Sequence, residues 1–256
     1  MSHKIITCAP SRQCGSTVFG MLLNQALTYS NMRSMFTFTE VGSLAPEYIS
    51  VKDLADPTRS VMQLVKLIEL GALKENEILD FATSYAKNSY IMDLSNRTLT
   101  EKVTRKVVRH VFKHVPTDVI ICDDSTDTEN ITSEALIEDA NQIFIVITPS
   151  KKNYALLHDW LRNSKFNGKK NVYVVVNYYN EAIGSMRDIS RYIGLPAKRV
   201  CHLHFNPYIT KCSLNGALQD VIPYMADKDP RLTNLTGDMK SVTDCVLSEM
   251  GVKRWR

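Results

Sequence analysis

A short segment near the start of the chain, Ala9 to Thr17, holds residue types that can bind a phosphate. It reads Ala-Pro-Ser-Arg-Gln-Cys-Gly-Ser-Thr. A phosphate-binding P-loop has the pattern G-x-x-x-x-G-K-[ST], in which backbone N–H groups wrap the phosphates and the hydroxyl holds Mg²⁺. Gly15 and Thr17 match this pattern, whereas Pro10 replaces the first glycine and Ser16 replaces the lysine. The segment also fits a polar loop in which Ser16 or Thr17 caps the next helix.

Two carboxylates follow another apolar run, Val119–Cys122. Asp123 and Asp124 stand at the end of this run, where a buried strand is expected to finish. A carboxylate in that place can hold a Mg²⁺ ion with its water or position a nucleophile. The alternative is an acidic turn over 123–127 that caps the following helix, and the sequence leaves both interpretations open.

Two histidine pairs have spacings found in metal sites. His110 and His114 share one face of an expected helix, but zinc proteases need a glutamate after the first histidine, and Val111 stands there. His202 and His204 alternate on an expected strand. Because no third ligand with metal spacing accompanies them in the sequence, we expect packing or surface roles for this pair.

These candidate residues lie between short apolar runs that alternate with helical stretches. Runs that are apolar on both faces indicate strands of a parallel sheet covered by helices. We therefore predict one α/β domain over 1–256, with a mostly parallel sheet flanked by helices in three layers. The expected strands are Lys4–Ala9, Met35–Val41, Ser89–Leu94, Asp118–Cys122, Gln142–Thr148, Asn171–Asn177 and Val200–Phe205. The expected helices are Ser16–Tyr29, Ser60–Gly71, Glu75–Lys87, Thr100–Lys113, Ser133–Ala140, Tyr154–Asn163, Met186–Ile193, Leu214–Ile222 and Met239–Met250.

Composition and charge place the chain among ordinary globular proteins. Of its 256 residues, 44% are hydrophobic and 23% are charged, which excludes a disordered, collagen-like or disulfide-stapled chain. No run reaches about 18 apolar residues, so no transmembrane segment is expected. The six cysteines lack C-x-x-C spacing and are expected to be reduced, mostly buried thiols of a cytoplasmic protein.

The order of these segments resembles that of the ParA/MinD family of deviant P-loop ATPases, which includes CpaE/TadZ-like members. Ile5–Val18 resembles the first strand and the loop K-G-G-x-G-K-[ST]. Asp118–Ser125 resembles the family's Walker B strand, and Gln142–Ser150 resembles the next strand, which ends in a Thr-Pro pair. The strand ending in Asn177 and the late loop containing Pro207 resemble the family's segments near the adenine. The resemblance thus covers nearly the whole chain.

This resemblance implies ATP or ADP with Mg²⁺ as cofactors, and it carries the family's roles to particular positions. Catalysis falls to Asp123 and to Glu40, and the metal to Thr17 and Asp123. The residues implied in nucleotide binding are Arg12, Cys14, Gly15, Ser16, Thr17, Val18, Asn177 and Pro207.

Both lysines of the family pattern are missing. The signature lysine aligns with Ser11 and the P-loop lysine with Ser16, while the family's catalytic aspartate falls near Thr39 or Glu40. Two cations fewer beside a triphosphate remove much of its electrostatic stabilisation. Arg12 either replaces part of that charge or is a solvated loop residue. We expect weak or absent nucleotide binding and hydrolysis, that is, a pseudo-ATPase scaffold; the alternative is an active Mg²⁺-dependent ATPase that recruits a cation from elsewhere.

The resemblance and the charge pattern suggest partners. Family members form face-to-face dimers, so a homodimer is expected, together with a protein partner from an assembly or membrane complex. The helix 97–114 carries the strongest basic cluster, which either binds DNA backbone non-specifically or is simply solvated. We expect a localisation, assembly or partition factor, cytoplasmic or peripheral to the membrane or nucleoid, and the DNA-binding partition protein stays open as an alternative.

Overall fold

Eight strands form the middle layer of the region that the computed structural model describes, residues 2–40, 43–49, 59–94, 99–124, 131–162, 166 and 171–252. Their order is β3-β4-β2-β5-β1-β6-β7-β8, and neighbouring strands are parallel except β3 and β4. Strands β2, β5 and β6 are buried at every position, because helices cover both faces. The bounds are β1 (His3–Cys8), β2 (Ser34–Phe38), β3 (Thr83–Ala86), β4 (Ser89–Ile91), β5 (Val119–Asp123), β6 (Gln142–Ile147), β7 (Val172–Tyr179) and β8 (Val200–His204).

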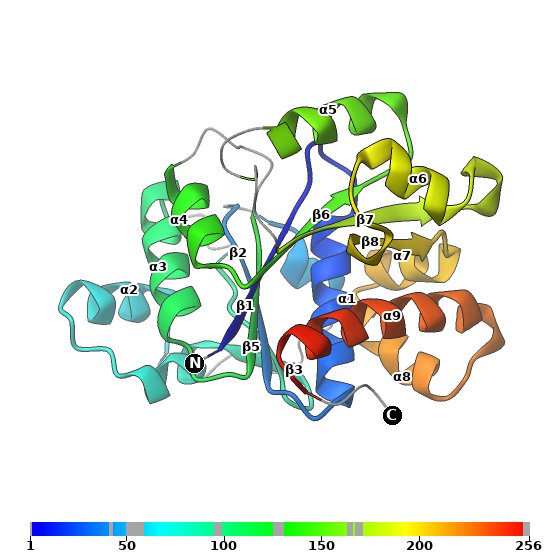
Figure 1. Cartoon of the computed structure of the whole chain (residues 1–256). Helices are drawn as coiled ribbons and strands as arrows, with labels where there is room; N and C mark the ends of the chain where they lie inside the picture. The colour runs from blue at the N-terminus through cyan, green and yellow to red at the C-terminus, as the bar shows by residue number, and fades with distance from the viewer. Residues whose placement is uncertain are drawn as a thin grey trace.

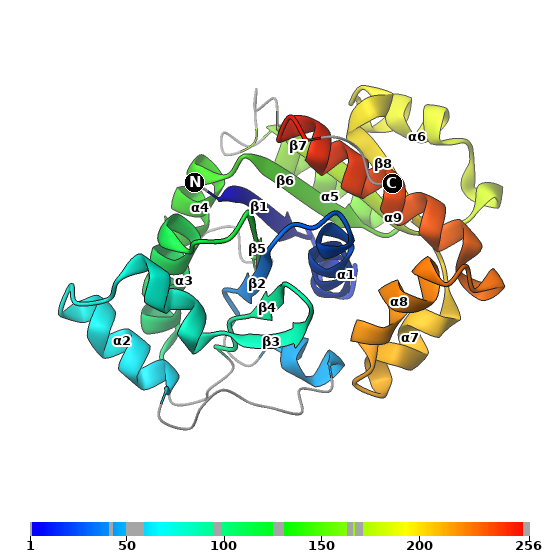
Figure 2. The same cartoon turned by 90° about the horizontal axis from the view of Figure 1, so that it is seen from below.

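Helices lie on both sides of the sheet and give three layers, as Figure 1 and Figure 2 show. Helix α1 packs on β2 beside α8 and α9, whereas α3 packs on β5 beside α2 and α4, and α5 packs on β6 beside α6. This confirms the predicted α/β fold. The α-helices are α1 (Ser16–Tyr29), α2 (Val61–Glu69), α3 (Glu101–His114), α4 (Ile131–Asp139), α5 (Lys151–Arg162), α6 (Met186–Ile193), α7 (Pro207–Leu214), α8 (Val221–Ala226) and α9 (Thr233–Glu249). Short 3₁₀ helices are η1 (Ala45–Tyr48), η2 (Glu75–Phe81), η3 (Glu181–Ile183), η4 (Ala197–Arg199), η5 (Leu218–Asp220) and η6 (Pro230–Leu232).

The helix expected over 75–87 is wrong. The segment forms η2 and then β3, which pairs antiparallel with β4. Tyr85 in β3 accepts a hydrogen bond from the side-chain amide of Asn24 on α1, and Asn88 adopts a φ of 61° in the turn to β4. A contact with a distant helix and a left-handed turn residue therefore override the local helical pattern.

The single helix expected over 214–222 is also wrong, because α7 ends at Leu214, α8 begins only at Val221, and the short η5 lies between them. Helix α7 begins at Pro207, and the side chain of Asn206 accepts a hydrogen bond from the backbone N–H of Tyr208. Asparagine before proline is a strong start signal for a helix. Gly216, with a φ of 63°, lies in the break between the two helices.

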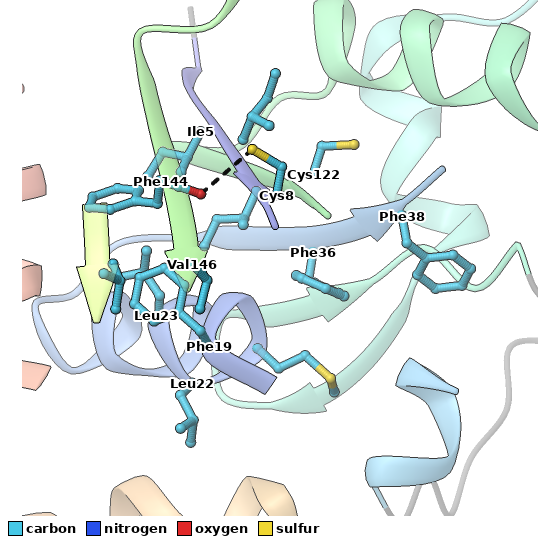
Figure 3. Close-up of a cluster of buried hydrophobic side chains, with 14 of the residues drawn as sticks. Ile5, Cys8, Phe19, Leu22, Leu23, Phe36, Phe38, Cys122, Phe144 and Val146 are labelled. Atoms are coloured by element: carbon cyan, nitrogen blue, oxygen red, sulfur yellow. Dashed lines mark hydrogen bonds between the residues drawn. The ribbon is translucent and has the colours of Figure 1, made fainter. Parts of the chain in front are cut away.

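The core beneath the first helix is shown in Figure 3. Phe19 of α1 meets Phe144 of β6 edge to face, with ring centroids 5.5 Å apart. The thiol of Cys8 points to the carbonyl oxygen of Phe144 at 3.9 Å. A Cβ at Gly20 would lie 2.7 Å from the ring of Phe36, so only glycine lets α1 approach the sheet this closely. Tight packing of α1 fixes the position of the loop that precedes it.

All six cysteines carry free thiols, and four of them are buried, as expected. In the described part of the chain, every helix is too short or too polar to cross a bilayer.

Candidate functional site

The loop between β1 and α1 has one position whose backbone and surroundings favour glycine. Gly15 has a φ of 86° and precedes α1, and a Cβ there would overlap the side-chain amide of Asn177. Ser16 and Thr17 are the first residues of α1, so the prediction that one of them caps the helix is wrong. In the part of the chain that the structure describes, α1 has no side-chain cap, because its N-cap residue is Gly15, and the N–H groups of its first turn bring a partial positive charge to this end of the helix.

Asp123 ends β5 directly opposite this first turn. Its Oδ1 accepts a hydrogen bond from Thr7 Oγ1 at 3.1 Å, and its Oδ2 accepts one from Thr17 Oγ1 at 2.5 Å. Burial raises the pKa of Asp123 to about 6, although hydroxyl groups of Thr17, Ser16 and Thr7 lower it. The hydroxyl groups thus do not offset the cost of burying this carboxylate.

The neighbouring Asp124 is buried as well. Its Oδ1 accepts a hydrogen bond from Thr39 Oγ1 at 2.9 Å, and its backbone N–H donates to the carbonyl oxygen of Thr7. Both aspartates are therefore part of the interior at the end of the sheet. The rest of the acidic turn proposed over 123–127 lies outside the described residues.

A cavity of about 290 Å³, here called the loop cavity, opens above the first turn of α1. Glu40 is exposed and stands at this cavity together with the two aspartates. Among the described residues that line it, Arg12 carries the only positive side-chain charge, against three carboxylates. The predicted site residues that line the loop cavity are Arg12, Cys14, Gly15, Ser16, Thr17, Val18, Glu40 and Asp123.

A second space of about 220 Å³, here called the side cavity, adjoins the loop cavity because Gly15 and Val18 line both. Asn177 lines it too and donates a hydrogen bond from Nδ2 to the carbonyl oxygen of Cys14 at 2.8 Å. This amide thus joins the end of β7 to the loop. Pro207 lines neither of the two cavities in the described part of the chain, and its neighbour Asn206 lines the side cavity instead.

Exposed aromatic rings stand beside the side cavity. Tyr178 is 44% exposed and Phe205 is 58% exposed, and their rings meet edge to face with centroids 5.8 Å apart. Tyr178 takes a φ of 56°, which turns the chain at the end of β7. Sequence reasoning missed Tyr178, since nothing in the sequence distinguishes an exposed tyrosine from a buried one.

Ser11, which aligns with the missing signature lysine, is tied to its own chain. Its hydroxyl donates to Asn153 Oδ1 of α5 at 2.8 Å, and Asn153 Nδ2 donates to Thr148 Oγ1 at 2.6 Å. Asn153 is buried, with 6% of its surface exposed. These contacts hold the loop against α5, and a sequence offers no sign of a partner so far along the chain.

A basic groove runs along α3 next to α2. Glu101 pairs with Arg105, and Lys106 lies 3.8 Å from Glu69 of α2. The groove has a volume of about 700 Å³ and is lined by Ile68, Glu101, Lys102, Arg105, Lys106, Arg109, His110, Lys113 and His114. Arg97, included in the predicted basic helix, lies outside the described residues.

Comparisons with known proteins bear on the fold. No family model and no curated protein sequence matches the chain. Among solved structures, MinD of Aquifex aeolicus, seen in a complex with MinC, matches with a TM-score of 0.70 and 13% identity over 98% of this chain and 97% of that one. MinD of Pyrococcus horikoshii, complexed with Mg-ADP, matches with a TM-score of 0.67 and 14% identity over 99% and 100%. A ParA family ATPase from Chlorobium tepidum matches with a TM-score of 0.67 and 13% identity over 96% and 98%.

These likenesses extend over nearly the whole length of each chain. They show that this chain has the fold of the MinD and ParA ATPases, whose members share an α/β sheet of this kind. At such low identity they assign no role to any single residue, and the roles of the predicted site residues stay predictions.

Proposed function

We propose that the chain is a positioning or partition factor with a MinD/ParA-like fold that binds an adenine nucleotide with Mg²⁺, where the sequence alone predicted weak or absent binding, and that it hydrolyses the nucleotide slowly or not at all. The observation that carries the proposal is the contact of Thr17 Oγ1 with Asp123 Oδ2, 2.5 Å long, at the uncapped start of α1. A hydroxyl and a carboxylate are the hard oxygen ligands that Mg²⁺ takes beside a phosphate. That the Pyrococcus horikoshii protein is complexed with Mg-ADP supports this assignment.

The arrangement suits two parts of a nucleotide. The loop cavity offers first-turn N–H groups and the left-handed Gly15 to phosphates. The adjoining side cavity, with Asn177 and the ring of Tyr178 at its rim, offers amide and aromatic groups to a base. Thr17 and Asp123 would hold Mg²⁺, and the ion would supply positive charge that the side chains of the loop cavity do not supply.

Charge explains why hydrolysis is expected to be slow. The loop cavity sets Arg12 against Glu40, Asp123 and Asp124, so its side chains sum to a formal negative charge. Phosphoryl transfer depends on positive charge placed at the oxygens of the transferred group. Ser16 supplies none, and Ser11 is held by Asn153 instead of reaching outward. Nucleotide binding should therefore depend strictly on Mg²⁺.

The test is calorimetric titration of the purified protein with ADP and ATP, with and without Mg²⁺. We expect micromolar binding with Mg²⁺ and none without it. A Gly15→Ala variant should lose binding, because it strains the backbone and overlaps Asn177. Gly71→Ala is the matched control, since Gly71 has a φ of 64° with nothing near its missing Cβ. No binding at millimolar Mg²⁺-nucleotide, or unchanged binding by Gly15→Ala, would refute the proposal.

The basic groove on α3 favours a second candidate function, non-specific DNA binding. Five of its lining side chains are lysine or arginine and one is glutamate. The affinity of a protein for the DNA phosphate backbone falls steeply as the salt concentration rises. Replacing Lys102, Arg109 and Lys113 with alanine should weaken binding of a labelled duplex at least about tenfold at low salt, whereas replacing the exposed Lys151 and Lys152 on α5 should not. Binding that ignores salt, or equal effects of the two sets, would exclude this function.

A further inference from the structure

Two histidines of β8 meet a buried aspartate of α9 at the edge of the sheet. His202 Nε2 lies 3.1 Å from Asp238 Oδ1, and His204 Nδ1 lies 2.8 Å from Asp238 Oδ2. The three ligand atoms all lie within 4.8 Å of one another. The sequence predicted no third ligand for this histidine pair. That prediction is wrong, because the fold brings Asp238 of α9 to the two histidines.

The donor set suits a divalent transition metal. Two imidazole nitrogens and one carboxylate oxygen are ligands of Zn²⁺, with bonds of about 2.0–2.2 Å. Ligand atoms at such bond lengths around a tetrahedral ion lie about 3.3 Å apart. The two nitrogen–oxygen distances, 3.1 and 2.8 Å, lie near that value, so small side-chain rotations would bring both nitrogens and one carboxylate oxygen to it. Three protein ligands leave a fourth position for water or another ligand.

The three side chains are held in place by their surroundings. Asp238 is 6% exposed, and its Oδ2 also accepts a hydrogen bond from the backbone N–H of His204 at 2.8 Å. The ring of Tyr179 packs against both imidazoles, with centroids 4.6 and 5.1 Å away. The histidine side chains remain 30% and 21% exposed, which gives an ion a path from solvent. A preorganised and accessible set of ligands is what a metal site requires.

We propose that His202, His204 and Asp238 form a Zn²⁺ site with one open coordination position. The ion would take the place of the protons that now join each imidazole to the carboxylate. It would also fix β8 to α9 just before the segment that leads into α7. Because His204 lines the side cavity together with Gly15 and Asn177, a bound ion would lie beside the space proposed for the base.

The experiment is a titration of the chelator-treated, full-length protein with Zn²⁺ in competition with a chromophoric chelator, repeated with Co²⁺ to record its visible absorption. We expect one equivalent bound per chain. His204→Ala and Asp238→Asn should each weaken Zn²⁺ binding at least about 100-fold, since each removes a ligand and loss of an outer-shell partner alone costs 10–100-fold. Zn²⁺ should also raise the melting temperature of the wild-type protein and not that of Asp238→Asn.

The matched control is His110→Ala combined with His114→Ala on α3. These rings lie with centroids 4.8 Å apart, and Glu75 contacts His114 at 3.0 Å, so they are a competing surface cluster. The control should bind Zn²⁺ as the wild type does. The proposal fails if the wild type binds no Zn²⁺ at stoichiometric concentration, or if the control removes binding that the site variants retain. Should His204→Ala fail to fold by circular dichroism, His202→Gln gives the same test with less change in volume.

Discussion

Asp123 and Asp238 are both buried aspartates, and the structure gives them opposite surroundings. Asp123 accepts hydrogen bonds from threonine hydroxyls, and burial raises its pKa to about 6. Asp238 lies against two histidines and a backbone N–H group, and although burial opposes ionisation, these hydrogen bonds lower its pKa below the ordinary value. Two buried aspartates thus have pKa values shifted in opposite directions, because their hydrogen-bond donors differ.

The difference distinguishes two kinds of polar interior. At Asp238, the protein supplies partners that stabilise the carboxylate in the isolated chain. At Asp123, the donors are hydroxyl groups, and they do not offset the cost of burying the carboxylate. The ionised Asp123 at the end of β5 should therefore contribute less to folding stability than the ionised Asp238 does between β8 and α9.

The largest effect is expected when Asp238 is replaced by asparagine. The amide keeps one acceptor oxygen for three donors, so the free energy of unfolding should fall by about 3 kcal/mol. Denaturant unfolding at pH 7 in the presence of a chelator measures this. Asp227→Asn, at the exposed end of α8, should change stability by less than about 0.5 kcal/mol. Equal effects at the two positions would show that the contacts of Asp238 stabilise the protein no more than those of an exposed aspartate.

A smaller effect of opposite sign is expected for Asp123→Asn. The folded protein holds a proton on Asp123 up to pH about 6 and the unfolded chain only to about 4, so wild-type stability falls as pH rises through this window. Asparagine removes the penalty and should raise the free energy of unfolding by about 2 kcal/mol above pH 6, with no gain below pH 4. The check is denaturant unfolding across pH without Mg²⁺ or nucleotide. A loss of stability at pH 7 would show that the carboxylate is well compensated.

The smallest effect is expected from adding a cation to the loop cavity. Ser16→Lys should tighten Mg²⁺-ADP binding about fivefold, equal to about 1 kcal/mol, because the ammonium offsets one of the three carboxylates. Titration calorimetry measures the change. Ser241→Lys, on the exposed face of α9, adds the same charge far from the loop and serves as the control. Unchanged or weaker binding by Ser16→Lys would mean that charge does not limit this site.

The sequence predicted the sheet well because its inner strands are apolar on both faces. We could identify the strands Val119–Asp123 and Gln142–Ile147 from their own residues, without knowing which strands pair with them. The two wrong helices fall where a turn or a distant contact decides the structure, as at Asn88 and Gly216. Local sequence patterns identify buried strands, but they do not show left-handed turns or contacts between distant segments.

The candidate site residues show the same difference between local patterns and contacts of distant segments. Gly15 and Thr17 were found by a motif, since their spacing is local. The contact of Ser11 with Asn153 and that of His202 with Asp238 join segments far apart in the sequence. No spacing rule connects such residues, because only the folded sheet brings β8 and α9 together.

The hydrogen bond from Asn177 to Cys14 has a consequence for the order of folding. The loop takes its shape from residues on β7 and α5, so it depends on contacts between distant parts of the chain. Contacts of that separation form late, after the loop between them has closed. A nascent chain that ends before β7 can build β1 and α1 without giving the loop between them its final shape. Ligand binding would thus report completion of the fold, because the loop assumes its final shape only after the later strand has joined the sheet.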